Sequence, residues 1–437
     1  MKNAKIVYVP IEIKARGLVG RILLATELAS RGYTVVLGTH YLVRDMAVKG
    51  AKGILIDKDL EEARCDVFKK IHNKGGRVFA WYEEFVFPKN CEFIGPIIGI
   101  STVDEIDGVF LWGENNKEIY EPIIDSVRNK LFVVGSPRID VLGNNLSKMY
   151  GINAKAKYGR YILVCSSAGI NPRKDNKKLF EEMACESDPE KNGYNYFNDL
   201  NRIKEEVTWK LVECVKKLAS EIDITIIFRA HPDEDETLWE KAFEGYSNVI
   251  ATTEGYANDW ITEAELMIHC GCTTALEAYM SGVKSILYNP IVNEKYYTEF
   301  PNILSTEVAD YDSLHREVIK IINGSDGEFF TEEKNRVVSE YIYARDDELC
   351  VKRVANVVDE YSDGMETAYK FKIHRKSNFI NEFIIFMNRF KYVRRSKFPN
   401  TTTKEVRKYI EKSCNVLNIK KRVKCTKLYP NIFMLEK

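Results

Sequence analysis

Short apolar runs alternate with helical patterns along the first 140 residues of the chain. Residues 5–10 and 33–38 are apolar at nearly every position, and residues 19–31 between them carry leucines at helical spacing before an Arg31-Gly32 stop. Further strands are expected at 53–56, 77–81, 108–112 and 130–134. Because continuous apolar strands separated by helices are typical of a parallel sheet covered on both faces, the pattern predicts a doubly wound α/β domain.

A second α/β series follows residues 141–158, which lack periodicity and are expected to form an interdomain linker. Its expected strands are 161–166, 222–229, 248–252, 266–269 and 284–289, and its expected helices 200–220, 273–281 and 311–322, with a polar insertion at 185–198. We therefore expect two Rossmann-like domains, 1–140 and 159–330, facing each other across a cleft. A C-terminal helix at 331–364 and a basic tail at 365–437 complete the chain, and ligands are expected at the carboxyl ends of the strands.

Composition places the chain among large globular proteins. It has 437 residues, of which 45% are hydrophobic and 29% charged, and this composition argues against a disordered or collagen-like chain. No fixed repeat is present. The formal net charge is zero, but residues 365–437 hold 19 Lys and Arg against 5 Asp and Glu, so a tail of +14 follows a body of −14.

The basic tail has two interpretations. From Phe371 onward aromatic and aliphatic residues recur at helical spacing between basic clusters, at Phe379, Ile380, Phe383, Ile384, Phe386, Met387 and Phe390. Residues 371–424 could lie on an anionic membrane surface, or they could pack on the acidic body. Nucleic acid is not expected as a partner, because no nucleic-acid-binding motif accompanies the basic residues.

The ends of the chain and its cysteines indicate a compartment. There is no apolar run long enough to span a membrane, and the N-terminus enters a strand directly instead of a signal peptide. Ten cysteines at irregular spacings are expected to be reduced thiols. The sequence therefore predicts a cytoplasmic protein, with peripheral attachment at the inner face of the membrane if the tail binds lipid.

Two segments of the second series point to a phosphate. Arg229, His231 and Pro232 follow an apolar strand, and a guanidinium and an imidazole there suit an anionic group. About forty residues later a strand, Gly271 and the pair Thr273-Thr274 lead into a helix whose free N–H groups attract anions. Glu277 is either a capping residue or an acceptor for ribose hydroxyls. The spacing of His269, Cys270 and Cys272 does not favour zinc, and no metal site is expected.

Two further segments lie in the first series. Glu83 and Glu84 follow an apolar strand and could supply a general base, or they could be a solvated acidic pair. The segment with Glu12, Lys14 and Arg16 is expected to be a loop at the cleft edge, and it either holds an acceptor or is a solvated loop. No dinucleotide-binding or P-loop fingerprint is present, so the sequence does not favour an oxidoreductase or an ATPase.

Together the motifs resemble bacterial surface-carbohydrate biosynthesis proteins of the GT-B glycosyltransferase fold, distantly similar to polysialyltransferases and capsule Kdo transferases. The resemblance covers roughly residues 5–360. It rests on residues 10–16, Glu83-Glu84, the segment Gly135-Ser136-Pro137-Arg138-Ile139-Asp140, His231-Pro232, and Thr273-Thr274 with Glu277. Teichoic acid glycerophosphotransferases look like a second relative, since they carry a similar Gly-x-Pro-Arg-x-Asp segment and a His-Pro pair.

The resemblance implies an activity and roles for these residues. It implies a glycosyltransferase that moves a sugar from a nucleotide donor, CMP-linked or CDP-linked, to a glycan or lipid-linked acceptor, without a cofactor. His231, Pro232, Thr273 and Thr274 would bind the donor phosphate, and Glu83 or Glu84 would be the base. Arg229, Gly271, Glu277, Ser166 and Ser167 complete the expected donor site; Lys14 and Arg16 are the expected acceptor-binding residues and Glu12 a further catalytic candidate.

Two departures from the family pattern leave rival functions open. Phe85 stands where the family has Gly, and Tyr82 replaces an upstream Asp, so the shape of the expected base loop is altered. One alternative is a CDP-glycerol-type glycerophosphotransferase, and a second is a non-hydrolysing nucleotide-sugar epimerase, which shares the two-domain architecture. A non-catalytic nucleotide-sugar-binding scaffold is the third alternative.

Overall fold

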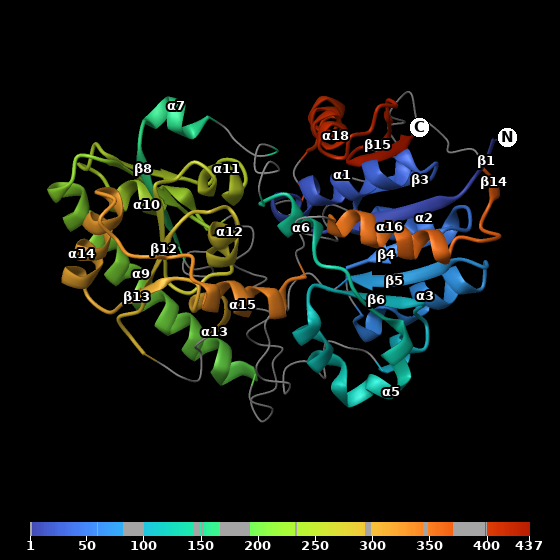
Figure 1. Cartoon of the computed structure of the whole chain (residues 1–437), viewed down its shortest axis with the longest axis horizontal. Helices are drawn as coiled ribbons and strands as arrows, with labels where there is room; N and C mark the ends of the chain where they lie inside the picture. Colours follow the sequence, from blue (N-terminus) through green and yellow to red (C-terminus); the bar gives the residue numbers. More distant parts are fainter. Residues whose placement is uncertain are drawn as a thin grey trace. The chain divides into compact units, whose positions relative to one another are not determined.

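The computed structural model describes residues 2–58, 60–81, 100–143, 149, 153–166, 193–231, 234–292, 299–343, 348–369, 398 and 400–437. The chain divides into two compact units (Figure 1). One unit holds residues 1–149 together with 335–437, and the other holds residues 150–334. The division between 149 and 150 falls within the expected linker, whose last residues form helix α7 (Ala154–Tyr158). The N-terminal unit thus differs from the expected 1–140, because the C-terminal hundred residues join it.

The N-terminal unit is built on a sheet with the order β15-β16-β3-β2-β4-β5-β6-β7 in the described part of the chain. The strands from β3 to β7 in this order are parallel, and β16 joins β3 antiparallel. Parallel strands buried on both faces require nearly continuous apolar sequence, which is the pattern seen. Their bounds are β2 (Ile6–Ile11), β3 (Thr34–Thr39), β4 (Ile54–Asp57), β5 (Arg77–Trp81), β6 (Gly108–Leu111), β7 (Leu131–Val133), β15 (Lys424–Tyr429) and β16 (Ile432–Glu436).

The helices of the first half of the chain connect these strands. Helix α1 is amphipathic only weakly, because both of its sides are covered. The bounds are α1 (Lys14–Ser30), α2 (His40–Lys49), α3 (Cys65–His72) after a short η1 (Glu62–Arg64), α4 (Ile100–Val103), η3 (Glu114–Ile123), α5 (Ile124–Val127), η4 (Arg128–Lys130) and α6 (Pro137–Asp140).

Helix α1 begins five residues earlier than the sequence pattern predicts, so Lys14 and Arg16 lie in its first turn and not in a loop. The apolar spacing is hidden here by two charged residues and by Gly17, and a second glycine, Gly20, lies further along the helix. A Cβ at Gly20 would lie 2.7 Å from the backbone of Pro137, which shows that α1 and α6 approach too closely for any side chain. Glycine in a helix normally signals a weak helix, and here close packing overrides that propensity.

The C-terminal segment does not form a separate basic tail in its described part. Helices α15 (Glu332–Tyr341) and α16 (Cys350–Glu360) are followed by β14 (Thr367–Tyr369), which pairs with β1 (Lys2–Ala4), and later by α18 (Thr403–Val416) and the β15–β16 hairpin. Helix α18 packs against α1 (Figure 1). The alternative that the tail packs on the body is therefore what the structure shows for residues 400–437, while most of the amphipathic stretch, 370–397, lies outside the described residues.

The segment Gly135–Asp140, which carries part of the family resemblance, attaches helix α16 to the N-terminal unit. Arg353 of α16 donates from Nε to the Val134 carbonyl at 2.8 Å, and the Asp140 carboxylate accepts the backbone N–H of Val351 at 3.3 Å. Gly135 has φ +90°, and a Cβ there would lie 2.4 Å from the Tyr343 carbonyl. The motif thus has a structural role, since its acidic residue satisfies the first turn of α16.

We expect Asp140→Asn to change the pH dependence of stability. Burial raises the pKa of Asp140 to about 6 from its ordinary 3.8. The folded protein therefore keeps a proton that the unfolded chain has already lost, so this contribution to stability is present below pH 3.8 and disappears as the pH rises through 6. The wild type should lose about 3 kcal/mol relative to Asp140→Asn between pH 4 and pH 7. Urea unfolding of both chains at several pH values measures this, and parallel pH curves would contradict it.

The second unit has a parallel sheet with the order β10-β9-β8-β11-β12-β13 among the described residues. One face packs on helices α9, α10 and α14 around Phe228 and Trp239, and the other on α11 and α12 around Trp260. The strands are β8 (Tyr161–Cys165), β9 (Thr225–Arg229), β10 (Val249–Thr252), β11 (Leu266–His269), β12 (Ser285–Tyr288) and β13 (Thr306–Val308). The helices are α9 (Gly193–Glu221), α10 (Glu236–Ala242), α11 (Ala257–Ile261), α12 (Thr274–Met280), α13 (Glu299–Asn302) and α14 (Tyr311–Ile322).

Candidate functional site

Three neighbouring strands of the second unit end side by side. Cys165, the last residue of β8, is in register with Arg229 at the end of β9 and with His269 at the end of β11. Adjacent strands lie about 4.8 Å apart, so these three residues form one row on one face of the sheet. The loops that follow them begin with Ser166, Ala230 and Cys270. The two segments expected to bind phosphate, about forty residues apart in sequence, therefore meet at one edge of the sheet.

Arg229 is the buried cation of this row, with only 4% of its surface exposed. Its two terminal nitrogens donate to the carbonyls of Ala230 at 3.2 Å and Gly255 at 2.8 Å. Burial lowers the pKa of Arg229, and the nearby carboxylates of Asp259 and Glu277 oppose that shift. A guanidinium stays charged under such conditions, so Arg229 supplies positive potential beneath the loops and holds the Gly255 turn in place.

Ser166 and His231 are joined through Glu234. The Ser166 hydroxyl donates to Glu234 Oε2 at 2.6 Å, and the His231 backbone N–H lies 2.9 Å from Ser166 Oγ and 3.0 Å from the same carboxylate oxygen. The indole N–H of Trp239 also donates to Glu234 Oε2, at 3.2 Å. Glu234 is fully buried. The carboxylate thus fixes the backbone at His231 and leaves its half-buried side chain at the strand end.

The loop after β11 is shaped by His269. Its Nδ1 accepts the backbone N–H groups of Gly271 at 3.1 Å and Cys272 at 3.3 Å, and its Nε2 contacts the Ser305 hydroxyl at 2.8 Å. Burial lowers the pKa of His269 to about 3, so the ring is neutral with its proton on Nε2. Gly271 has φ +83°, which an L-residue adopts only with strain. His269 is therefore a positioning residue for the turn.

The first turn of α12 follows directly. Thr273 occupies the N-cap position, is exposed and makes no side-chain cap. The Thr274 hydroxyl is buried and has no hydrogen-bond partner among the residues described, apart from the neighbouring thiol of Cys165. Glu277 is 3% exposed and so lies beneath the helix end and not on it. Lys204 of α9 lies near Cys272, and burial lowers its pKa. The lysine therefore lies near the loop that joins the glycine turn to the start of α12.

Solved structures resemble this chain, although no protein-family model and no curated protein matches it. A Listeria monocytogenes protein, provisionally described as a UDP-N-acetylglucosamine 2-epimerase, is similar with a TM-score of 0.53 and 13% identity over 82% of this chain and 97% of that one. A variant of the wall teichoic acid polymerase TagF has a TM-score of 0.51 and 9% identity over 82% of this chain and 88% of that one. The chain has the GT-B fold. This likeness is one of fold, and it confirms the two Rossmann-like domains expected from the sequence.

The candidate residues of the N-terminal unit are held in ion pairs. Glu12, 7% exposed, pairs with Lys58, which follows β4. Lys14 donates to Glu405 Oε2 of α18 at 2.9 Å and is 8% exposed, while Arg16 is exposed. Lys14 therefore links the start of α1 to the C-terminal segment. The expected base residues Glu83 and Glu84, together with Ser167 and Pro232, lie outside the described residues.

Three residues of the site were not assigned from the sequence. Glu234 lies two residues after Pro232, and its position in that segment was a usable signal. His269 was weighed only as a metal ligand. Lys204 has no sequence signal, because it lies on α9, more than sixty residues before the turn.

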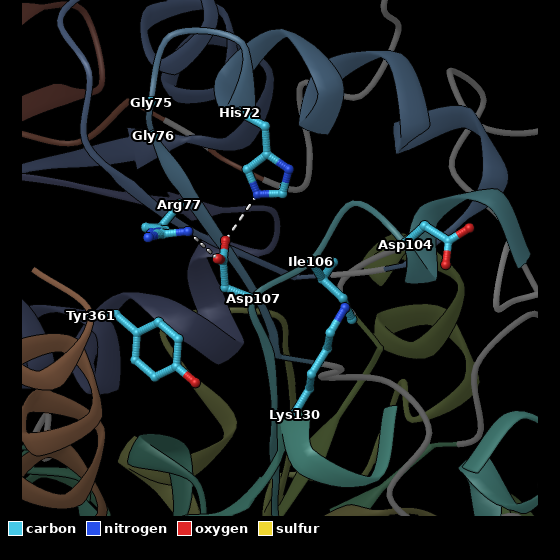
Figure 2. A pocket seen from close by; sticks show the side chains of 9 residues that line it. All are labelled: His72, Gly75, Gly76, Arg77, Asp104, Ile106, Asp107, Lys130 and Tyr361. Carbon is cyan, nitrogen blue, oxygen red and sulfur yellow. Dashed lines mark hydrogen bonds and ion pairs between the residues drawn. The ribbon is translucent and has the colours of Figure 1, made fainter. Parts of the chain in front are cut away.

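A pocket of the N-terminal unit lies at the opposite, amino-terminal edge of its sheet. This cavity of about 480 Å³ is lined by His72, Gly75, Gly76, Arg77, Asp104, Ile106, Asp107, Lys130 and Tyr361 (Figure 2). The ring of His72 contacts Asp107 at 2.9 Å and Glu105 at 3.2 Å, and Arg77 contacts Asp107 at 3.0 Å. The hydrogen bond with Asp107 raises the pKa of His72. These ion pairs join α3 to the loop before β6.

The described residues contain neither a metal-binding cluster nor a membrane-spanning helix. No group of three or more His, Cys, Asp or Glu among them is arranged to hold a metal ion. Within the same residues, no helix combines the length and apolarity needed to cross a membrane.

Proposed function

We propose that the protein is a glycosyltransferase of surface-glycan biosynthesis that binds a nucleotide-sugar donor at the strand-end site of its second unit. One observation carries the proposal. The ends of β8, β9 and β11 bring Ser166, His231 and the Gly271 turn to one edge of a parallel sheet, the edge at which such sheets bind ligands. The acceptor is a glycan or a lipid-linked glycan bound by the N-terminal unit.

The chemistry follows from fixed positive groups. Transfer forms a bond from the acceptor oxygen to the sugar, breaks the bond from the sugar to the donor phosphate, and leaves negative charge on that phosphate. His231, Lys204 and the N–H groups at the start of α12 stabilise this charge, and Arg229 adds its potential from below. No metal ion is needed for this neutralisation.

The proton of the acceptor hydroxyl goes to a carboxylate base of the N-terminal unit. Glu83 and Glu84 are the proposed bases, as the family resemblance implies. Glu12 is the third carboxylate proposed, and it forms an ion pair with Lys58. The donor nucleotide is proposed to be CMP or CDP, and the protein to work at the inner face of the membrane.

A ligand screen tests the donor site. We expect one of the CMP-, CDP- or UDP-sugars to raise the melting temperature of the full chain, because a ligand that binds only the folded state stabilises it. His231→Ala should weaken that ligand about tenfold or more while leaving the melting temperature without ligand unchanged. His315→Ala, on α14 of the same unit and paired with Glu221 at 3.3 Å, is the matched control. Equal affinity of both variants would place the nucleotide elsewhere.

Product analysis separates the rival activities. A glycosyltransferase releases the free nucleotide only with an acceptor present. Release of an epimerised sugar without acceptor would identify an epimerase, and binding without turnover a scaffold.

A further inference from the structure

Helix α2 of the N-terminal unit begins without a cap. Its ten residues follow β3 directly, and Thr39 at the N-cap position makes no side-chain hydrogen bond to the first turn. No acidic residue lies in that turn. The first N–H groups of a helix have no partners within the helix, and together with the helix dipole they attract negative charge. A helix of this length usually has a cap, so its absence needs an explanation.

Two buried polar atoms lie at the same point. The hydroxyl of Thr39 and Nδ1 of His40 are both buried and have no hydrogen-bond partner in the part of the chain that the structure describes. Thr39 is only 6% exposed. A buried polar atom without a partner costs about 1–3 kcal/mol, and so it is retained where a ligand or a catalytic role uses it. These two atoms are an unfilled pair of hydrogen-bonding groups at the helix start.

Charged side chains of both signs surround His40. After burial, the groups that act on the pKa of His40 are Arg44, Lys58 and Arg64, which lower it, and Glu12, which raises it. Each of these charged side chains has a partner of its own: Arg44 binds Asp57, Arg64 contacts Glu61 and Lys58 pairs with Glu12. The imidazole therefore lies among three ion pairs, and the attraction for an anion at this point comes from the first N–H groups of the helix and its dipole.

This helix start lies at the carboxyl edge of the N-terminal sheet. The chain runs from β2 to β3 on one side of β2 and then crosses to β4 on the other side of β2. The strand order therefore reverses at β2. Thr39 is in register with Ile11, the last residue of β2. Ligands of open α/β sheets bind at the carboxyl ends of the strands, in the crevice where the order reverses, which here lies between β2 and β4. The start of α2 follows β3, the other neighbour of β2, and so lies at the same edge of the sheet, beside that crevice.

We propose that the start of α2, with Thr39 and His40, is a binding site for a phosphate or carboxylate group of a small ligand. The Thr39 hydroxyl and the first N–H groups of the helix donate to the anion, and His40 donates once it is protonated beside it. The site lies in the unit that does not contain the proposed donor site, and it does not depend on that proposal. If the protein is a glycosyltransferase, the site selects acceptors that carry a negative group.

Histidine NMR of the full chain tests the site, because the chain has only six histidines. We expect inorganic phosphate to shift the ring signals of His40, assigned from a His40→Gln chain, and to raise its pKa above about 4. Glycerol 3-phosphate and glucuronate distinguish phosphate from carboxylate ligands, and glycerol and glucose are neutral controls. A His40 signal that none of the three anions moves would overturn the proposal.

Thr39→Val is the decisive variant, since valine has the same shape without the hydroxyl. It should raise the phosphate dissociation constant about tenfold, as expected for one lost hydrogen bond to a charged group. It should not lower the melting temperature, because the hydroxyl has no partner to lose. Thr34→Val, at the other end of the same strand and 8% exposed, is the matched control.

The outcomes separate this site from the donor site. A response of His40 without one of His231 supports the present proposal even if no nucleotide sugar binds. A response of His231 alone supports the donor site and contradicts the present one. Equal phosphate affinity of Thr39→Val and Thr34→Val, or a lower melting temperature of Thr39→Val, also contradicts it.

Discussion

A chain that ends at Asp363 is expected to lose the folded N-terminal unit. The removed segment contains β16, which pairs with β3, and in it Ile432, Phe433 and Leu435 are completely buried. Val406 of α18 is buried as well, in a helix that packs on α1. Each such side chain contributes about 1.5–3 kcal/mol, so the loss is comparable with the whole stability of a domain. Circular dichroism and limited proteolysis of the truncated chain measure this, and a cooperative melt like that of the full chain would contradict it.

A second chain separates packing from membrane binding. Replacing residues 371–397 by a Gly/Ser segment of equal length keeps α18 and the β15–β16 hairpin. This chain should melt like the wild type. Residues 371–397 are part of the 371–424 stretch that could lie on an anionic membrane. If they attach the protein to membranes, co-sedimentation of the full chain with anionic vesicles should be salt-sensitive and should disappear in the replaced chain, whereas neutral vesicles should bind neither chain. Equal sedimentation of both chains would remove the membrane proposal without affecting the packing result.

His269→Leu is expected to destabilise the second unit by about 2–4 kcal/mol at pH 7. The substitution removes the acceptor of the Gly271 and Cys272 N–H groups and the partner of Ser305, and an unpaired group in a partly buried turn costs about 1–3 kcal/mol. Because the turn loses its fixed shape, nucleotide affinity should fall as well. Urea unfolding and ligand titration measure the two effects, with His315→Leu on α14 as the control.

The same residue should make the wild type sensitive to acid. In the unfolded chain His269 has its ordinary pKa of 6.5, whereas in the folded protein burial lowers its pKa to about 3. Between these two pH values only the unfolded chain binds a proton at His269. The contribution of His269 to the free energy of unfolding is therefore fully present above pH 6.5. It decreases by about 1.4 kcal/mol for each pH unit below that value. The variant lacks this loss, so the two unfolding free energies should converge near pH 4 to 5. A constant difference from pH 7 to pH 4 would show that His269 is not buried in its neutral form.

Regular apolar runs made most of the sheet predictable. The strand β5 and the helix α14 have the bounds expected from the sequence, and β11 does too, because each is a continuous pattern ended by Gly, Pro or a polar cluster. The start of α1 was missed because Lys14, Arg16 and Gly17 interrupt its apolar pattern, and Gly20 stands in its second turn. Only the close approach to Pro137 explains why glycine stands there.

The candidate site divides in the same way. A polar residue at the end of an apolar strand is visible in the sequence, so Arg229 and His231 were found, as was the Gly271 turn. The sequence did not show which of these side chains is accessible to a ligand. Arg229 proved to be bonded to two carbonyls, and Lys14, expected to bind an acceptor, proved to be paired with Glu405 almost four hundred residues away.

By itself the sequence determined the α/β class, the two sheets and the strand ends that carry the polar candidate residues. Hydrophobic periodicity and the residues that end helices and strands act over a few neighbouring positions. The tertiary structure alone decided that residues 400–437 complete the first sheet, that His269 holds a turn and that α2 begins without a cap. These features depend on contacts between distant parts of the chain. Their free energies come from burial and from the pairing of polar groups, and neither is set by the residues adjacent in sequence.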